Sequence, residues 1–377
     1  MNPTRLTAII RKEVYHLLRD YRSLYLAFAI PLLLIMLFGY ALSLDVDRVE
    51  TVVVDYDKSQ LSRDFIRKLD ASSYFNIAAY LPRVQDAVGY LDRDAAKVAI
   101  VIAPDFMKNL QAEREAQLQI LIEGSDPNFA GIIRGYLTAF TEQYNQQLLL
   151  EFLNRRGMEA IQPPVDGRIR IWFNEDLESR NFIIPGIIAI IIMIVGALLT
   201  SLVIAREYEN GTMETLKSLP VKAGELLLGK AIPYFFIGFT DVLVAMLLGQ
   251  LLFGVVMKGN FLLMMAATAL YLCVALALGL LISSATKSQL VANQVAILIT
   301  YLPSVLLSNF VFPIVNMPKV LQAITYIVPA RYYIDILGGI YLRNTGFTYL
   351  WPSMATLAFI ALGLAGLNYV LLKKEGL

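Results

Sequence analysis

Six long apolar segments constrain this 377-residue chain more than any other feature. A helix that crosses a bilayer needs about 20 mostly apolar residues, and each segment is that long. With 57% hydrophobic residues, the chain has the composition of a protein whose solvent is largely lipid. We therefore predict an α-helical membrane protein with six transmembrane helices, at residues 24–44, 182–204, 231–256, 261–285, 290–315 and 349–372.

The positions of lysine and arginine predict which side of the membrane each loop faces, because short cytoplasmic loops are enriched in both. Basic residues precede the first segment, follow the second and the fourth, and occur near the end of the chain: Arg5, Arg11, Lys12, Arg19, Arg22, Arg206, Lys217, Lys222, Lys230, Lys287, Lys373 and Lys374. The opposite short loops hold only Lys258, Lys319, Arg331 and Arg343. Both termini, including a tail at residues 373–377, are therefore predicted to be cytoplasmic.

Residues 1–23 have apolar side chains at helical spacing, with most basic side chains on other faces. This pattern predicts an amphipathic helix that lies along the cytoplasmic membrane surface. The alternative is a plain cytoplasmic extension of the first transmembrane helix.

Residues 45–181 are charged and globular in composition, and they alternate between strand-like and helical runs. Such alternation predicts an extracytoplasmic α/β domain with a partly parallel sheet, inserted between the first and second transmembrane helices. The predicted strands are 51–54, 75–80, 98–102 and 117–122, and the predicted helices are 61–69, 83–91, 105–113 and 129–154. After Pro163 and Pro164, residues 168–173 are predicted to form a last strand.

Residues 316–348, between the fifth and sixth apolar segments, contain two apolar stretches that are each too short to cross a membrane. Prolines interrupt the region at Pro318 and Pro329. Irregular backbone at membrane depth needs protein or a cavity around it, so we predict a re-entrant pair of short helices. A pair of amphipathic helices lying on the surface is the alternative.

The polar stretch 205–230 separates the second and third apolar segments and carries four basic residues. A polar loop of roughly 25 residues between two membrane-crossing helices lies on one side of the bilayer, and its charges predict the cytoplasmic side. This stretch is therefore a surface on which another protein can act.

Nothing in the sequence supports chemistry carried out by the chain itself. Gly224, Gly229 and Lys230 match part of a phosphate-binding loop, but Ala231 replaces the required Ser or Thr and leucines fill the loop. The chain has one cysteine and one histidine, too few for a metal centre of these residues. We expect no enzyme activity, no cofactor and no nucleic-acid partner.

Four polar residues within the predicted transmembrane helices are candidates for a functional role. Asp241 is the only carboxylate well inside one, and a charge there is costly unless it is paired, protonated or in a wet cavity. It suggests either a transport path or polar packing against another helix. Asn293, Gln294 and Asn309 give weaker forms of the same signal.

The chain resembles the permease subunits of ABC-2 type exporters over essentially its whole length. The resemblance is carried by seven stretches in order: 55–65, 98–106, 172–186, 205–221, 224–234, 312–318 and 328–343. It is greatest to the subgroup with a large extracytoplasmic insert, the multidrug-efflux permeases. The sequence departs at Gly338, where relatives often have a basic residue, so a charge pairing with Asp335 is in doubt.

The resemblance implies that the stretch after the second transmembrane helix couples the permease to a separate cytoplasmic ATPase subunit, which binds ATP and magnesium. Carried over, the coupling residues are Arg206, Glu207, Glu209, Gly211, Thr212 and Glu214. It also implies a homodimer, or a heterodimer with a related permease, in the lipid bilayer of a bacterial inner membrane. A periplasmic adaptor (membrane fusion protein) is a further partner that it allows.

The function implied is ATP-driven export of drug-like or amphipathic molecules. One alternative is a proton-coupled secondary transporter that uses Asp241, and another is an exporter of polysaccharide or lipid. A receptor that senses a ligand through its extracytoplasmic domain is a further class, although six transmembrane helices exceed what signalling requires.

Overall fold

A computed structural model of the chain describes residues 2–19, 21–41, 48–112, 114–125, 127–155, 173–174 and 178–376. The chain divides into two compact units, one formed by Met1–Ser43 with Ile171–Leu377 and the other by Leu44–Arg170. The second unit is thus inserted into the first along the sequence.

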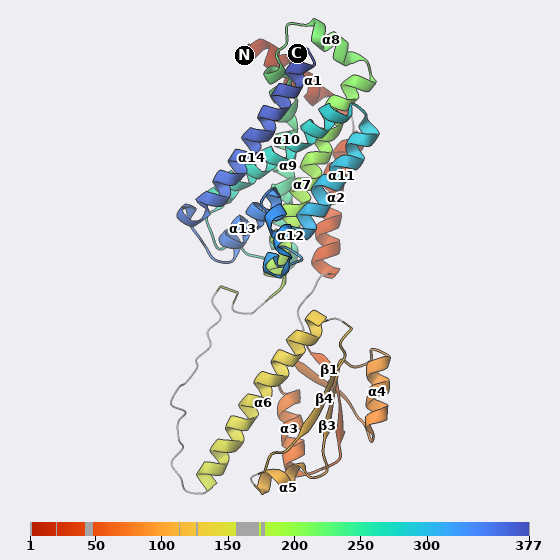
Figure 1. Cartoon of the computed structure of the whole chain (residues 1–377), viewed down its shortest axis with the longest axis vertical. Coiled ribbons are helices and arrows are strands. Elements are labelled where there is room, and N and C mark those ends of the chain that lie inside the picture. The colour runs from red at the N-terminus through yellow and green to blue at the C-terminus, as the bar shows by residue number, and fades with distance from the viewer. Residues whose placement is uncertain are drawn as a thin grey trace. The chain divides into compact units, whose positions relative to one another are not determined.

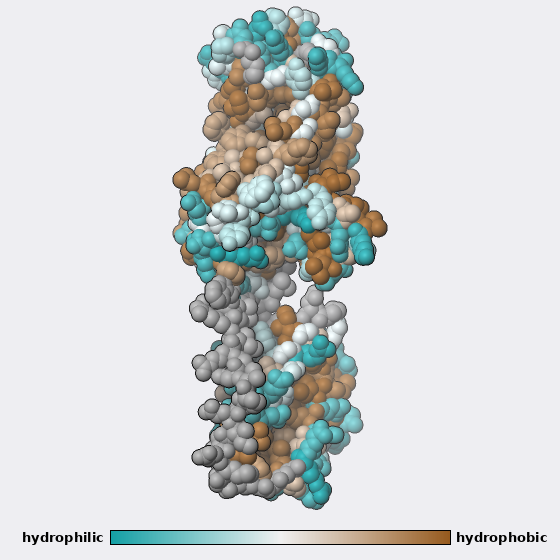
Figure 2. All heavy atoms as spheres, turned by 60° about the vertical axis from the view of Figure 1, so that its left-hand side comes forward, coloured by the Kyte–Doolittle hydropathy of each residue, from teal (hydrophilic) through white to brown (hydrophobic). Residues whose placement is uncertain are grey.

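The first unit is helical (Figure 1). Its helices are α1 (Pro3–Arg19), α2 (Tyr21–Ala41), α7 (Arg180–Glu209), α8 (Thr212–Ser218), α9 (Ala223–Phe253), α10 (Phe261–Thr286), α11 (Gln289–Leu306), the 3-10 turn η1 (Ile314–Asn316), α12 (Lys319–Thr325), α13 (Pro329–Tyr341) and α14 (Phe347–Lys374). Figure 2 shows hydrophobic residues around the middle of this unit and hydrophilic residues at the end that holds α1 and α8.

Among the described residues, five helices are long and apolar enough to cross a membrane: α7, α9, α10, α11 and α14. They cover five of the six predicted segments. The first predicted segment corresponds to α2, in which the apolar helix among the described residues, Phe28–Tyr40, is shorter. Six crossings therefore remain a prediction.

The helix α7 forms the centre of the helical unit, and its side chains are buried almost continuously from Ile183 to Ala205. It packs closely against α10. The Tyr271 hydroxyl donates to the Ala189 carbonyl at 3.1 Å, and Thr200 Oγ1 donates to the Leu276 carbonyl at 3.0 Å. Because polar groups in a core must be hydrogen-bonded, these two bonds fix how α7 and α10 face each other.

The predicted end of the fifth apolar segment differs from the structure by the largest margin. The helix α11 ends at Leu306, whereas the fifth apolar segment was predicted to run to residue 315. Residues after Leu306 turn back, with Asn309 at φ 71°, and the short elements η1 and α12 follow. Apolar composition continues past the helix end, so hydropathy alone could not locate it.

The polar stretch 205–230 is mostly helical rather than a loop. The helix α7 extends to Glu209 and α9 begins at Ala223, with α8 between them. Charged residues of this stretch therefore lie on the end of α7 and the start of α9, beyond the apolar region. Helical backbone fixes their positions.

The second unit is an α/β domain. Its elements are β1 (Val49–Asp55), α3 (Gln60–Asp70), β2 (Phe75–Tyr80), α4 (Val84–Asp92), β3 (Val98–Ile102), α5 (Phe106–Gln111), β4 (Leu118–Ile122) and α6 (Pro127–Arg155). The strand order is β2-β1-β3-β4, with β1 parallel to β2 and β3, and β4 antiparallel to β3. The partly parallel sheet is confirmed, while most of the predicted strand at 168–173 lies outside the described residues.

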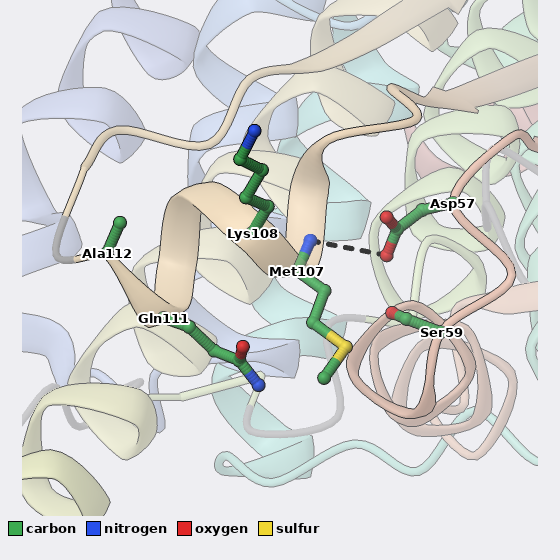
Figure 3. A pocket seen from close by; sticks show the side chains of 6 residues that line it. All are labelled: Asp57, Ser59, Met107, Lys108, Gln111 and Ala112. Carbon is green, nitrogen blue, oxygen red and sulfur yellow. Dashed lines mark hydrogen bonds between the residues drawn. The ribbon is translucent and has the colours of Figure 1, made fainter.

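Helices cover both faces of this sheet (Figure 1). One core joins β1 and β3 to α3, α5 and α6, and the other packs the opposite face against α4. At the carboxyl end of the parallel strands, Asp57 accepts a hydrogen bond from the Met107 backbone N–H at 3.2 Å beside a shallow cavity (Figure 3). This bond ties the turn after β1 to the start of α5.

Candidate functional site

The candidate site lies at the end of the helical unit where α1, α8, the end of α7 and the start of α9 meet (Figure 1). Gly211, at φ 69°, separates α7 from α8. A left-handed conformation of this kind costs most residues a steric penalty that glycine avoids. The glycine therefore sets the direction in which α8 leaves α7.

The helix α1 is seated on α9 by close packing. Its buried side chains, Ile9, Glu13 and Leu17, recur every four residues and so share one face. A side chain at Gly229 of α9 would come within 2.6 Å of Ile9, so only glycine allows this approach. The predicted amphipathic helix is confirmed as a helix, and its buried face contacts the protein.

A buried ion cluster joins these elements. Lys230 of α9 and Glu13 of α1 are each 2% exposed, and Lys230 Nζ lies 2.5 Å from Glu13 Oε1 and 2.9 Å from Glu207 Oε1 of α7. Lys12 Nζ lies 2.8 Å from the same Glu207 oxygen. Two positive and two negative charges thus balance, which burial of ions requires.

The cluster continues into α8 and the chain start. The Thr212 hydroxyl donates to Glu207 Oε2, which links the first residue of α8 to the cluster. Glu225 of α9, also buried, accepts hydrogen bonds from the backbone N–H groups of Asn2 at 2.7 Å and Lys222 at 3.2 Å. The end of α7, α8, α9 and α1 are therefore joined through charged hydrogen bonds, the stronger kind.

A second polar network lies beside the first. Glu209 accepts hydrogen bonds from Gln289 at the start of α11, from its backbone N–H at 2.8 Å and its side-chain amide at 2.5 Å. The Tyr208 hydroxyl donates to Glu375, and Lys287 Nζ lies 2.7 Å from Glu375 Oε1. The end of α7 is thereby connected to α11 and to the end of α14.

The six predicted coupling residues fall into two groups. Arg206, Glu207, Glu209 and Thr212 contact other parts of the helical unit; Arg206 Nη1, for example, lies 3.0 Å from His16 Nε2 of α1. Gly211 lies in open space between α7 and α8, and Glu214 is exposed on α8. An outside protein can therefore reach Glu214, whereas Glu207 is buried and suited to hold the helices together.

Sequence reasoning missed the two central residues of the buried cluster, Lys230 and Glu13. Lys230 was considered only as a basic residue of the cytoplasmic stretch and as part of a false phosphate-binding loop, and Glu13 was not considered. The available signal was a lysine at the start of an apolar helix together with a lone glutamate in an otherwise basic amphipathic helix. Neither feature indicates which residue is its partner, because the two residues are 217 positions apart in the sequence.

The four predicted intramembrane polar residues do not form one site. Asp241 is 4% exposed on α9, Asn293 is half-buried on α11, and Gln294 is exposed there. Asn309 lies beyond α11, where its side-chain oxygen accepts from the Ile314 N–H at 3.0 Å and shapes the turn. Within the described part of the chain, no hydrogen bond joins these four side chains to one another.

The fold and sequence together define a multi-pass membrane protein, and comparison with known proteins gives its family. Residues 22–369 match the model of the ABC-2 family transporter proteins, so the chain belongs to the ABC-2 family of transporter permeases.

Individual relatives match over most of their length. The chain is 35% identical to the probable multidrug ABC transporter permease YbhS of Escherichia coli, over 98% of this chain and 97% of the relative. It is 28% identical to the probable multidrug ABC transporter permease YbhR of the same organism, over 98% and 99%. The inner membrane transport permease YhhJ is 26% identical over 85% and 83%.

Proposed function

We propose that this chain is the membrane subunit of an ATP-driven exporter of drug-like or amphipathic molecules, located in a bacterial inner membrane and powered by a separate cytoplasmic ATPase subunit. The names of the relatives YbhS and YbhR support the multidrug class. The observation that carries the mechanism is the buried cluster of Lys230, Glu13 and Glu207, because it joins the exposed helix α8 to three other helices.

In this proposal the ATPase contacts the exposed side of α8, and the cluster transmits its movement. A ligand or partner protein shifts the equilibrium between two conformations only if it interacts differently with each of them. Glu214 on α8 is accessible for such contact. Glu207 then passes the movement of α8 to α1 and α9, since it holds Thr212, Lys12 and Lys230 at once.

The proposed topology has six crossings with both termini and α8 in the cytoplasm, α12 and α13 re-entrant, and the α/β domain on the other side. It is supported by the basic residues at the α1 and α8 end of the helical unit and by α12 and α13 at the opposite end (Figure 1). A dimer with a second permease and a periplasmic adaptor complete the proposed assembly.

The coupling is tested by ATP-dependent uptake of a fluorescent amphipathic dye into inverted vesicles that contain the full chain and its co-purified ATPase. Glu214→Ala should lower dye transport per ATP hydrolysed without changing the thermal stability of the permease. The control is Ser218→Ala, another exposed position on α8. Equal transport by the wild type and Glu214→Ala would contradict the contact assigned to this helix.

A proton-coupled transporter is the second candidate, favoured by the burial of Asp241 in α9. The two candidates separate in the same vesicles. ATP-dependent transport that persists after an ionophore collapses the proton gradient supports the ATP-driven exporter. Transport that requires the proton gradient, does not depend on ATP hydrolysis and is lost in Asp241→Asn supports the proton-coupled transporter.

A further inference from the structure

A cavity of about 500 Å³ lies at the end of the helical unit opposite α8, between two of the stretches that carry the family resemblance. Ile314 and Val315 contribute from the stretch 312–318, and most of the remaining wall comes from the stretch 328–343. Its volume is in the usual range for a small-molecule site. The coupling mechanism above does not use this cavity.

One face of α13 supplies the polar wall. Arg331, Asp335, Gly338 and Leu342 all line the cavity, and their spacing of three or four residues places them on one helical stripe. Arg343, just beyond the end of α13, adds a second cation. The wall therefore has two positive charges and one negative charge.

These charges do not neutralise one another. Arg331 is held by a hydrogen bond to Thr325 Oγ1 at 2.5 Å, and its guanidinium lies 4.0 Å from the centre of the Tyr326 ring. Asp335 accepts a hydrogen bond from the Ser353 hydroxyl at 2.9 Å. In the part of the chain that the structure describes, neither Asp335 nor Arg343 forms an ion pair. Charges of both signs are thus available in one cavity.

Part of the remaining wall is apolar, although Asn309, Tyr332 and Ser353 also line the cavity. Phe182 at the start of α7 and Ile314 and Val315 of η1 line the cavity, and Val315 is 87% exposed. An exposed apolar side chain next to a charged wall fits a molecule with a charged head and an apolar chain. A small inorganic ion would leave this apolar part unused.

We infer that this cavity binds an amphiphile whose head is a zwitterionic phosphoester with a primary ammonium group, as in phosphatidylethanolamine. The phosphate lies at Arg343 and Arg331, the ammonium donates to Asp335, and the apolar chain covers Val315 and Phe182. A purely anionic head would leave Asp335 without a cationic partner, and a purely cationic head would be repelled by the two arginines. The inference stands apart from the proposed transport function, because it concerns binding alone.

A larger side chain at Gly338 should fill the cavity without disturbing the fold. A side chain built at this glycine meets nothing within 4 Å. Leucine is also a better helix former than glycine. Gly338→Leu should therefore block the cavity while α13 remains folded, and Gly363→Leu on α14, where space is equally open, is its control.

The test is native mass spectrometry of the full chain in detergent with added phosphatidylethanolamine, phosphatidylcholine or phosphatidylglycerol. The wild type should retain phosphatidylethanolamine most tightly. Asp335→Asn and Arg343→Gln should each weaken that binding about tenfold, the effect of losing one charged hydrogen bond. Gly338→Leu should weaken it at least as much, because its side chain occupies the cavity. Lys319→Gln, which removes an exposed cation outside the cavity lining, and Gly363→Leu should bind as the wild type does.

Specificity gives a readout that a general loss of folding would not produce. Asp335→Asn should remove the preference for phosphatidylethanolamine over phosphatidylglycerol, because only the former has an ammonium group. If soluble glycerophosphoethanolamine displaces phosphatidylethanolamine at an equal concentration, the cavity recognises the same head group in a water-soluble molecule. Equal binding of the three lipids by the wild type, or undiminished binding by all three cavity variants, would overturn the inference.

Discussion

Lys230 Nζ and Glu13 Oε1 lie 2.5 Å apart, and both side chains are almost fully buried although they belong to helices far apart in sequence. Removing two ions from water costs several kcal/mol each, and close partners must offset that cost. Here Glu207 and Lys12 complete the charge balance. The arrangement makes the position of α1 on α9 depend on electrostatics as well as on packing.

Lys230→Met should destabilise the protein by about 3–5 kcal/mol, because Glu13 then remains buried without its cation. Adding Glu13→Gln to that variant should recover part of the loss. Unfolding of the full chain in detergent measures both. Lys12→Met is the comparison and should cost less, since Lys12 is 51% exposed and Lys230 still pairs with the buried Glu207. Similar losses for Lys230→Met and Lys12→Met would contradict this account.

Gly279→Ala should destabilise the helical unit by about 1–3 kcal/mol through overpacking. A methyl group there would overlap the Ala197 carbonyl and Thr200 Oγ1 of α7. Backbone cannot yield as a flexible side chain can, so α7 and α10 would have to separate. Gly363→Ala meets open space on α14 and should be neutral or slightly stabilising. Comparison of the two thermal unfolding midpoints checks the prediction.

Gly211→Ala should impair transport more than Gly211→Asn. Open space surrounds this position, but its φ of 69° is left-handed. Alanine pays a penalty of about 1–2 kcal/mol there, whereas asparagine tolerates the conformation better. Relief of that strain would redirect α8. Dye transport per ATP hydrolysed, measured for both variants in vesicles, tests this, and equal values would show that the direction of α8 is not set by this glycine.

The α/β domain should lose stability in acid through Glu123. Hydrogen bonds from Ser125, with a further contribution from Lys97, lower the pKa of Glu123 from 4.5 to about 2. A carboxylate with a depressed folded-state pKa stabilises fully above its unfolded pKa, and that stabilisation is lost as the pH falls from about 4.5 towards 2.

Urea unfolding of the fragment Leu44–Arg170, followed by circular dichroism between pH 5.5 and about 2.5, measures this loss. The control is Glu123→Gln, which keeps the shape of the side chain but cannot ionise, so its stability should fall less over that range. If the free energy of unfolding falls equally with pH in the wild type and the variant, groups other than Glu123 cause the acid sensitivity.

The sequence predicted most of what depends on local pattern. Strand-like runs located β2 and β3 to the residue, and hydropathy located the cores of α7, α10 and α14. The stretch 205–230 was described from the sequence as a polar loop, but the structure shows that most of it is helical. Charged residues there continue α7 and α9, and polarity does not distinguish a loop from the solvated end of a helix.

The sequence alone therefore determined the class of protein, the inserted α/β domain and the family, because periodicity, composition and ordered motifs are properties of neighbouring residues. Only the tertiary structure decided that Lys230 neutralises Glu13, that Glu207 is buried, and that Asn309 shapes a turn. Each of these depends on which helices meet in space, and such contacts leave no regular spacing along a single chain.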